Sequence, residues 1–450
     1  MTNPLPQRVL VANRGEIARR VIATCRRLGV GSVAVHHAVD AGLPFVAEAD
    51  IAHEITGDVP VKAYLDGAQL IEVARSTGAT AIHPGYGFLA ENADFAQQVT
   101  DAGLTWIGPT PESIRTMGDK VESRRVVAAH GVPVSGGADD ALASVEEAVT
   151  EAARIGYPVI VKASGGGGGI GMAVAHDEEQ LRKAFESTRS MAERSFGSDR
   201  VFVERFVSTA RHIEVQVLGR ADGSIVALGE RDCSVQRRHQ KLVEECPAPH
   251  LSDDVRRRLH ESAVLAAGSV GYLNAGTVEF LLDTVTEDFV FLEMNTRIQV
   301  EHPVTELTHG VDLVEQQLSI AQTGTTTADF APALKGHAIE LRICAEDPKR
   351  FFPSPGDIDV WEPPTGPDIR LDAGYAQGTT VTPYFDPMIA KLCVHADTRE
   401  QAVERARAAA AAFEIGPLTT NLPFLVELLD SAEFSAGRYD TNIVANIKSK

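Results

Sequence analysis

Near the N-terminus, short apolar runs alternate with helical patterns, and this alternation restricts the fold more than any other feature. Residues 8–12 form an apolar run typical of a buried strand, and residues 16–28 carry apolar side chains at helical spacing. A second apolar run covers residues 32–36, a helical pattern covers 65–76, and a third run covers 79–82. Strand–helix–strand alternation is typical of a parallel sheet with helices on both faces. We therefore predict a doubly wound α/β domain at the start of the chain.

The pattern changes after residues 131–140, which are rich in glycine, proline and aspartate. A compact βαβ-like unit is predicted to follow, up to about Val207. From residue 212 to 218 polar and apolar residues alternate, which indicates an antiparallel strand, and residues 276–282 and 289–295 predict a second antiparallel pair. The expected fold is therefore α/β followed by α+β. The predicted domains are residues 1–115, 116–330 with a subdomain at about 131–207, and 331–450.

Composition excludes several classes of function. The formal net charge of −20 would repel a nucleic-acid backbone or an anionic membrane, so we predict neither as a partner. No apolar run approaches the roughly 20 residues that a membrane span needs. The five cysteines include no CxxC pair, which favours a reducing compartment without disulfides or a zinc site, so the cytoplasm is the expected location.

A glycine-rich segment follows a predicted strand that ends in Lys162. Residues 165–169 and Gly171 are all glycine. Ordering so many glycines costs conformational entropy, so packing does not explain them, whereas a mobile loop with bare N–H groups can close over phosphates. No Gly-Lys-Ser/Thr follows, so this is not a Walker loop. A flexible linker is the alternative, but linkers rarely follow a buried strand that ends in lysine.

The segment from Glu293 to Glu301 is the most informative in the chain. If it is extended, its odd-numbered side chains share one face. That face would carry a carboxylate, an amide, a guanidinium, an amide and a carboxylate: Glu293, Asn295, Arg297, Gln299 and Glu301. Glu279, on the preceding predicted strand, could face Glu293 across a hairpin and complete a pair of oxygen ligands for Mg²⁺. A solvated polar strand face is the alternative interpretation.

Residues 231–241 form a local basic cluster in an acidic protein. Anion binding is the functional interpretation, and a charged surface loop is the alternative. His212 and Glu214 are predicted to share a face of their strand, although such a histidine is more often structural than functional. The segment from Asn13 to Glu16 follows the first strand without a GxGxxG motif, which disfavours a dinucleotide site and hence a Rossmann dehydrogenase.

Taken together, these motifs resemble the biotin carboxylase family of ATP-grasp enzymes over nearly the whole chain. Nine segments occur in the family's order, a combination that chance does not explain. They are residues 11–18 (Val-Ala-Asn-Arg-Gly-Glu-Ile-Ala), 81–92, 117–120 (Met-Gly-Asp-Lys), 162–169, 231–234 (Arg-Asp-Cys-Ser), 293–303, 336–342, 345–348 (Ala-Glu-Asp-Pro) and 383–391. The resemblance implies a Rossmann-like (pre-ATP-grasp) N-terminal domain, an ATP-grasp domain with a mobile glycine-rich lid, and an α+β C-terminal domain.

The resemblance also implies site residues. Those expected to bind the nucleotide are Lys120, Lys162, Gly166, Gly167, Gly168, Glu204, Arg205, Val207, His212, Gln236, His239 and Leu281. Those expected to hold Mg²⁺ or Mn²⁺, at two positions, are Glu279, Glu293 and Asn295. Those expected to hold bicarbonate and biotin are Lys241, Arg297, Gln299, Val300 and Arg342. Glu301 would remove the proton of bicarbonate, and Arg342 would meet the charge that develops on biotin, with Arg297 and Lys241 completing the catalytic set.

Two positions depart from the family's pattern. Ile170 stands in the lid where a basic residue is usual, which puts one lid contact in doubt, and Arg205 stands where lysine is common, which keeps the charge. The implied reaction is ATP-dependent carboxylation of biotin by bicarbonate through carboxyphosphate. The implied partners are a biotin carboxyl carrier protein, a carboxyltransferase and a second copy of the chain.

The chain contains no Met-Lys-Met biotinylation segment, so biotin is expected on a separate carrier or on another part of a longer polypeptide. Acetyl-CoA, and with it fatty-acid biosynthesis, is the default expectation for the final acceptor, on which the sequence is silent. Two alternatives stay open: another ATP-grasp carboxylating or carbamoyl-phosphate-type ligase, and a nucleotide-binding regulatory subunit without turnover.

Overall fold

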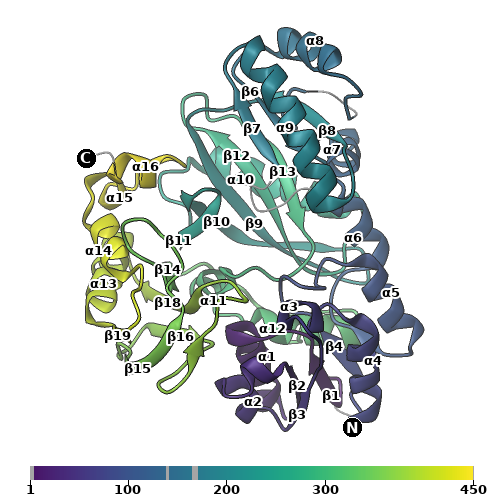
Figure 1. Cartoon of the computed structure of the whole chain (residues 1–450), viewed down its shortest axis with the longest axis vertical. Coiled ribbons are helices and arrows are strands. Elements are labelled where there is room, and N and C mark those ends of the chain that lie inside the picture. Colours follow the sequence, from purple (N-terminus) through teal and green to yellow (C-terminus); the bar gives the residue numbers. More distant parts are fainter. Residues whose placement is uncertain (1–4, 138–140, 165–170, 449–450) are drawn as a thin grey trace.

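The N-terminal domain of the computed structural model is built on a five-stranded parallel sheet (Figure 1). The model describes residues 5–137, 141–164 and 171–448. The strands, in the spatial order β3-β2-β1-β4-β5, are Ile51–Glu54, Gly31–His36, Arg8–Val11, Ala81–His83 and Thr105–Trp106. The helices are α1 (Gly15–Leu28), α2 (Pro44–Glu48), α3 (Pro60–Ala63), α4 (Gly67–Ser76), α5 (Ala93–Asp101) and α6 (Pro111–Gly118), with a 3₁₀ turn at Ala38–Asp40. The predicted doubly wound fold is confirmed.

The two strands that the sequence did not predict lie at the edges of this sheet. In β3 only Ile51 is partly buried and the other residues are exposed, so no apolar run marks the strand. The strand β5 is two residues long. Edge strands bury less surface than central ones, so their sequences carry a weaker pattern.

The segment predicted as a βαβ-like unit is instead an antiparallel sheet of order β7-β6-β8. Its elements are α8 (Val145–Ile155), β6 (Val159–Ala163), β7 (Met172–Ala175), α9 (Glu178–Phe196) and β8 (Val201–Arg205), and α7 (Lys120–Ala129) precedes them. A parallel pair needs a crossover of a dozen or more residues. The connection from β6 to β7 through the glycine run is too short for one, so β6 and β7 form an antiparallel hairpin.

An eight-stranded antiparallel sheet carries the rest of the molecule. Its spatial order is β13-β12-β9-β10-β11-β14-β18-β16. The strands are β9 (Ala210–Gly219), β10 (Ile225–Arg237), β11 (Gln240–Cys246), β12 (Asn274–Asp283), β13 (Phe289–Asn295), β14 (His337–Cys344), β16 (Ile369–Ala373) and β18 (Met388–Ala396). Because β11 pairs with β14, the sheet runs without a break across the predicted boundary at residues 330 and 331. Side chains distant in sequence therefore share one surface.

Helices and a small sheet complete the structure. The helices are α10 (Asp253–Gly268), α11 (His302–His309), α12 (Leu313–Thr323), α13 (Arg399–Ala412), α14 (Leu422–Asp430), α15 (Ala432–Ser435) and α16 (Ile443–Lys448), and the small sheet holds β15 (Gly356–Glu362), β17 (Thr380–Val381) and β19 (Glu414–Pro417). Thr398 caps α13 by accepting a hydrogen bond from the Gln401 amide. Figure 1 shows α8 and α9 at the top, the N-terminal domain at the bottom and the C-terminal helices at the left.

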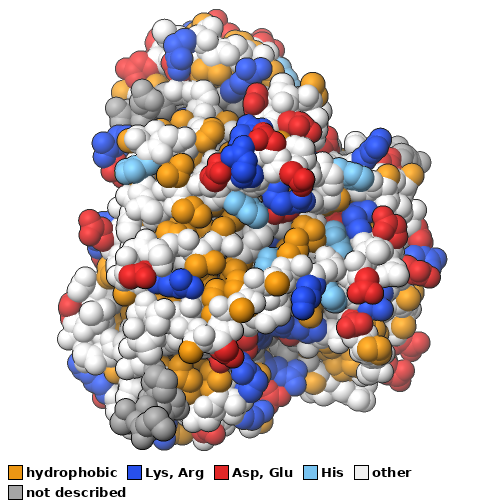
Figure 2. All heavy atoms as spheres, turned by 180° about the vertical axis from the view of Figure 1, so that it is seen from behind, with side chains coloured by type: hydrophobic (Ala, Val, Ile, Leu, Met, Phe, Trp, Pro, Cys, Tyr) orange, Lys and Arg blue, Asp and Glu red, His pale blue; other side chains and the backbone are white. Residues whose placement is uncertain are grey.

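The surface is a mixture of both charge types. Figure 2 shows Lys and Arg side chains interspersed with Asp and Glu over the rear face. Within the described part of the chain, no helix is long and apolar enough to cross a membrane.

The close approach of β9 to the start of β12 gives a test of this packing. A Cβ added to Gly219 would lie 2.0 Å from the Tyr272 carbonyl oxygen, so Gly219→Ala should cost about 2 kcal/mol through overpacking and lower the midpoint of thermal unfolding. Gly268→Ala, at the end of α10, meets no atom within 4 Å and is the matched control. A Gly219→Ala protein as heat-stable as the control would contradict this packing.

Candidate active site

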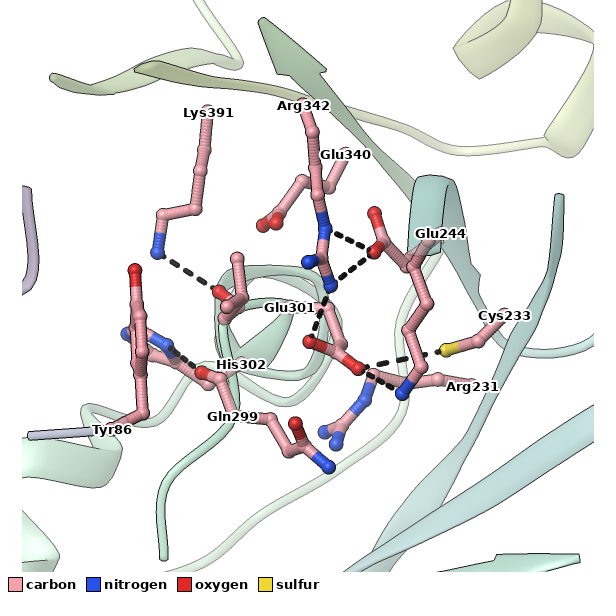
Figure 3. A network of polar contacts seen from close by, with 12 residues as sticks. Tyr86, Arg231, Cys233, Glu244, Gln299, Glu301, His302, Glu340, Arg342 and Lys391 are labelled. Carbon is pink, nitrogen blue, oxygen red and sulfur yellow. Dashed lines mark hydrogen bonds and ion pairs between the residues drawn. The ribbon is translucent and has the colours of Figure 1, made fainter. Parts of the chain in front are cut away.

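A buried carboxylate, Glu301, lies at the centre of a network of charged side chains (Figure 3). Glu301 is 0% exposed and precedes α11, for which it is the N-cap residue. Lys241 on β11 places its Nζ 2.6 Å from one carboxylate oxygen of Glu301. Arg342 on β14 places an Nη 2.9 Å from the other oxygen. Three segments far apart in sequence therefore meet on one carboxylate.

The neighbouring cations keep Glu301 ionised. Burial alone would raise the pKa of the Glu301 carboxyl, but Lys241, Arg342 and Arg231 more than offset this and hold the pKa well below its usual range. Arg342 is itself held from the other side, because its guanidinium lies 2.5 Å from Glu244. The Glu301 carboxylate is thus in the form that accepts a proton.

The basic segment 231–241 is not a surface loop, as the alternative interpretation held. It forms the β10–β11 hairpin, and Arg231 is 0% exposed. Arg231 donates to Glu214 at 2.6 Å and to Thr305 at 2.9 Å. Lys241 contacts Glu214, at 2.6 Å, as well as Glu301. Arg231 therefore neutralises a buried carboxylate beneath the site, and Lys241 is the cation of this hairpin that reaches Glu301.

The prediction that residues 293–301 form one extended row is wrong. β13 ends at Asn295, and residues 296–301 turn into α11. The polar side chains nevertheless meet, because the turn brings them back toward β12. Arg297 donates to Asn295 at 2.8 Å and to Gln299 at 3.0 Å, and both amides donate to Glu279, at 2.8 and 3.1 Å. Side-chain hydrogen bonds, rather than strand alternation, gather these groups.

The carboxylates on β12 and β13 fit a divalent cation. Glu279 and Glu293 are direct cross-strand partners, as the hairpin prediction requires. The Glu279 carboxylate lies 2.9 Å from His212 and 3.1 Å from Lys241, and Glu293 accepts a hydrogen bond from Lys120. Burial raises the pKa of Glu279, but Lys241 and His212 more than offset this and hold it well below its usual range. Two carboxylates and an amide oxygen form the hard donor set that Mg²⁺ or Mn²⁺ prefers.

Two lysines expected near the nucleotide phosphates approach the site from different elements. Lys120 begins α7, and Lys162 lies on β6. Lys162 is paired with Glu204 at 2.5 Å, and Arg124 lies 3.1 Å from the same carboxylate. The Glu204 side chain is therefore paired with two cations, which leaves the backbone of Glu204 to meet an adenine ring.

The other expected nucleotide residues lie around the same surface. Nε2 of Gln236 lies 2.7 Å from Nδ1 of His212, and His212 is the cross-strand neighbour of Leu281. Burial is the main cause of the lowered pKa of His239, with the charges of Lys162 and His212 adding to it. Arg205 is exposed at the end of β8, and Val207 follows it. Gly166, Gly167, Gly168 and Ile170 lie outside the described residues.

Comparison with known proteins shows which family has this fold and this arrangement of side chains. The biotin carboxylase N-terminal domain model matches residues 6–114, the carbamoyl-phosphate synthase L chain ATP-binding domain model matches 119–328, and the biotin carboxylase C-terminal domain model matches 340–446. Biotin carboxylase 2 of Bacillus subtilis is 46% identical over 438 residues, which covers 97% of this chain and 98% of that protein.

The chain belongs to the biotin carboxylase family.

Solved structures agree with this membership. The biotin carboxylase of Campylobacter jejuni, solved as a β,γ-ATP complex, superposes with a TM-score of 0.96 at 41% identity and covers 99% of this chain and 100% of that one. The biotin carboxylase domain of the Hydrogenobacter thermophilus 2-oxoglutarate carboxylase, a dimer solved with magnesium ADP and bicarbonate, gives 0.95 at 42% identity, covering 98% of each chain. The predicted three-part fold and enzyme class are confirmed. The chain is an ATP-dependent ligase with the biotin carboxylase activity of a biotin-dependent carboxylase.

Sequence reasoning missed two carboxylates of this biotin carboxylase. Glu91 accepts a hydrogen bond from Arg297 at 2.8 Å, and Glu244 is fully buried against Arg342. Burial raises the pKa of Glu244, and despite the opposing Arg342 it reaches about 7. Glu91 lies in a family motif, so the motif could have found it. Glu244 gives a weaker signal, two adjacent glutamates between the apolar residues Val243 and Cys246.

The buried pairing of Arg231 predicts a large stability effect. Arg231→Met leaves the Glu214 carboxylate buried with one cation fewer, so the protein should lose about 3–5 kcal/mol and unfold at lower temperature. Arg257→Met on the exposed face of α10 is the control, since surface pairs contribute little. Equal melting temperatures for the two variants would show that Glu214 does not depend on Arg231.

Proposed function

We propose that Glu301 is the base that activates bicarbonate in the carboxylation of biotin. The observation that carries this proposal is the buried Glu301 carboxylate held between Lys241 and Arg342. Bicarbonate is a poor nucleophile at neutral pH, and removal of its proton by a carboxylate in contact with it helps its oxygen attack the γ-phosphate of ATP. The ionised state of Glu301 supplies the acceptor for that proton.

The groups next to Glu301 are suited to hold bicarbonate. Lys241 and Arg297 offer cationic donors, Gln299 offers an amide, and the backbone of Val300 offers an N–H. A planar anion needs donors from several directions, and a guanidinium matches its two oxygens. We therefore assign bicarbonate binding to these four residues and proton transfer to Glu301.

The nucleotide phosphates are assigned to Lys120, Lys162 and the glycine-rich segment, with His212, Gln236 and His239 toward the sugar and the end of β8 toward adenine. Glu279, Glu293 and Asn295 are the proposed holders of two Mg²⁺ or Mn²⁺ ions. The metal, when bound, neutralises charge on the phosphates during transfer. Burial of the site excludes water, which protects the carboxyphosphate product of the first step.

The second step is assigned to Arg342. Carboxyphosphate decomposes to CO₂ and phosphate, and phosphate takes the proton of the ureido nitrogen of biotin. The guanidinium of Arg342 then stabilises the negative charge that develops on the ureido oxygen, as a fixed donor does in an oxyanion hole. Glu244 supports this role, because it orients Arg342 from the side opposite Glu301.

Biotin is proposed to arrive on a carrier protein and to leave for a carboxyltransferase. Several similar proteins are subunits or domains of larger carboxylases, including the acyl-CoA carboxylase alpha3 subunit of Mycobacterium leprae, 49% identical over 420 residues. Relatives act in acyl-CoA, methylcrotonoyl-CoA, 2-oxoglutarate and pyruvate carboxylases, so acetyl-CoA remains one acceptor among several. The cytoplasm remains the predicted location, although the methylcrotonoyl-CoA relatives are mitochondrial.

Removal of the proposed base or of the proposed oxyanion stabiliser should abolish most of the activity. Glu301→Gln and Arg342→Ser should each lower biotin-dependent ATP cleavage by at least about a hundredfold. The measurement is phosphate release with free biotin and bicarbonate, alongside a melting curve that verifies folding. The controls are Glu54→Gln and Arg75→Ser, which change exposed residues of β3 and α4. Near-normal turnover in both site variants would refute the assigned roles.

We also propose a homodimer, supported by the dimeric Hydrogenobacter thermophilus relative. Analytical ultracentrifugation should give twice the 48.2 kDa mass of the chain at micromolar concentration. A monomer at the concentration used in the activity assay would contradict this proposal.

A further inference from the structure

A buried lysine that the reaction scheme does not use lies behind Glu301. Lys391 on β18 is 0% exposed and is the cross-strand neighbour of Arg342 on one side and of Asp372 on the other. Its Nζ donates to the backbone carbonyl of Val300 at 2.9 Å and lies 3.1 Å from a carboxylate oxygen of Glu16. Figure 3 shows Lys391 and Arg342 extending side by side toward the chain at Glu301.

The contacts of Lys391 join three distant parts of the chain. Glu16 is in the first turn of α1, and Val300 precedes α11. Lys391 is on β18, which is the last strand of the large sheet in chain order. Tyr86 donates a hydrogen bond to the second oxygen of Glu16 and orients that carboxylate. A Cβ at Gly374 would lie 2.7 Å from the backbone nitrogen of Glu16, so α1 packs closely against the C-terminal domain here.

Lys391 carries its charge despite complete burial. Burial lowers the pKa of a lysine, but Glu16, Glu340 and Asp372 more than offset this, so the pKa of Lys391 lies above its usual value. An ionised, paired ammonium is a stronger hydrogen-bond donor than a neutral amine. The Val300 carbonyl is therefore held by a charge-assisted bond from a fully buried lysine.

The preceding carbonyl is held as well. Nδ1 of His302 lies 2.8 Å from the Gln299 carbonyl oxygen, and burial together with nearby cations lowers the pKa of His302 well below its usual value. The ring is therefore neutral and donates from Nδ1. Two consecutive carbonyls of the turn before α11 thus have fixed partners, His302 for Gln299 and Lys391 for Val300.

Because peptide units are planar, the hydrogen bonds to these two carbonyls also fix the directions of the N–H groups in the same peptides. In a trans peptide the N–H points away from the C=O of the same unit, and the cis bonds of the structure precede Pro158, Pro247 and Pro417 instead. With the Gln299 carbonyl held by His302, the Val300 N–H points to the opposite side. With the Val300 carbonyl held by Lys391, the peptide that leads into Glu301 is fixed in the same way.

We propose that Lys391 is a positioning residue for bicarbonate, which holds the Val300–Glu301 peptide so that the Glu301 carboxylate faces the anion together with the Val300 N–H that His302 orients. This inference rests on the proposed function, in which these two groups bind and deprotonate bicarbonate. Lys391 touches neither substrate nor the reacting atoms. A lysine that only joined domains would affect stability and the amount of folded enzyme, whereas a positioning lysine acts selectively on bicarbonate.

The test is Lys391→Met, which keeps the length of the side chain and removes its charge. The KM for bicarbonate should rise about tenfold, the size expected when one charge-assisted hydrogen bond is lost. The KM for ATP should change by less than about twofold, because none of the contacts of Lys391 involves a residue assigned to the nucleotide. Phosphate release is measured with free biotin at varied bicarbonate and varied ATP.

A second variant, Glu16→Gln, keeps the test decisive if Lys391→Met does not fold. A neutral amide holds the ammonium less firmly, so the same selective rise in the bicarbonate KM should appear at about threefold. Arg399→Met is the matched control, since it removes a largely buried cation of α13 that is paired with Glu245 on β11, and it should leave both KM values unchanged.

Equal changes in the two KM values, or a loss of turnover in proportion to folded protein alone, would overturn the inference. A normal bicarbonate KM in both variants, together with an inactive Glu301→Gln enzyme, would overturn it while leaving the proposed function in place. Full activity of Glu301→Gln would instead remove the proposed function on which the inference depends.

Discussion

The site depends on keeping a fully buried carboxylate ionised. Transfer of the Glu301 carboxylate from water into the protein is costly, and only cations within contact distance offset that cost. Lys241 and Arg342 supply this compensation, and each is balanced by further carboxylates, Glu214 and Glu244. The site is therefore a charge network in which the neighbouring cations hold Glu301 in its ionised form.

The large antiparallel sheet makes this network possible. Lys241 and Arg342 lie on neighbouring strands, β11 and β14, although a hundred residues of sequence separate them. The same sheet carries Glu279 and His212 on β12 and β9. Because strand positions are fixed by backbone hydrogen bonds, the charged groups are placed by rigid elements, which suits catalysis that depends on orientation and electrostatics.

The groups on this sheet divide between two tasks. Carboxylates and lysines toward β12, β13 and α7 surround the expected place of the phosphates and metal. Arg342 on β14, which Glu244 of β11 orients, lies on the side of Glu301 where biotin is expected, and Lys391 on β18 lies behind Glu301 without touching a substrate. Glu301 stands between the two groups, and Lys241 contacts both Glu279 and Glu301. A proton acceptor in that position can deprotonate the nucleophile that attacks the phosphate. The product of that attack then reacts with biotin on the other side.

The sequence by itself determined the parallel N-terminal sheet, the family and the types of group at the site. Those features are encoded locally: apolar runs in central strands, helical spacing in α1 and α4, and motif segments such as 293–303. Edge strands such as β3 escaped prediction because exposed positions carry no apolar pattern. The antiparallel hairpin of β6 and β7 was mistaken for a βαβ-like unit because apolar patterning reports burial, not strand direction.

Tertiary structure alone decided which charges meet. Residues 293–301 are polar at alternate positions, but their side chains converge through a turn and hydrogen bonds to Glu279 rather than along a strand. Arg231 has the sequence of a surface cation and is fully buried, because its partners Glu214 and Thr305 come from other elements. Glu244 and Lys391 acquire their contacts from strand register and domain packing. Such long-range pairing depends on sheet order and on the desolvation of both partners, neither of which a local pattern of residues can encode.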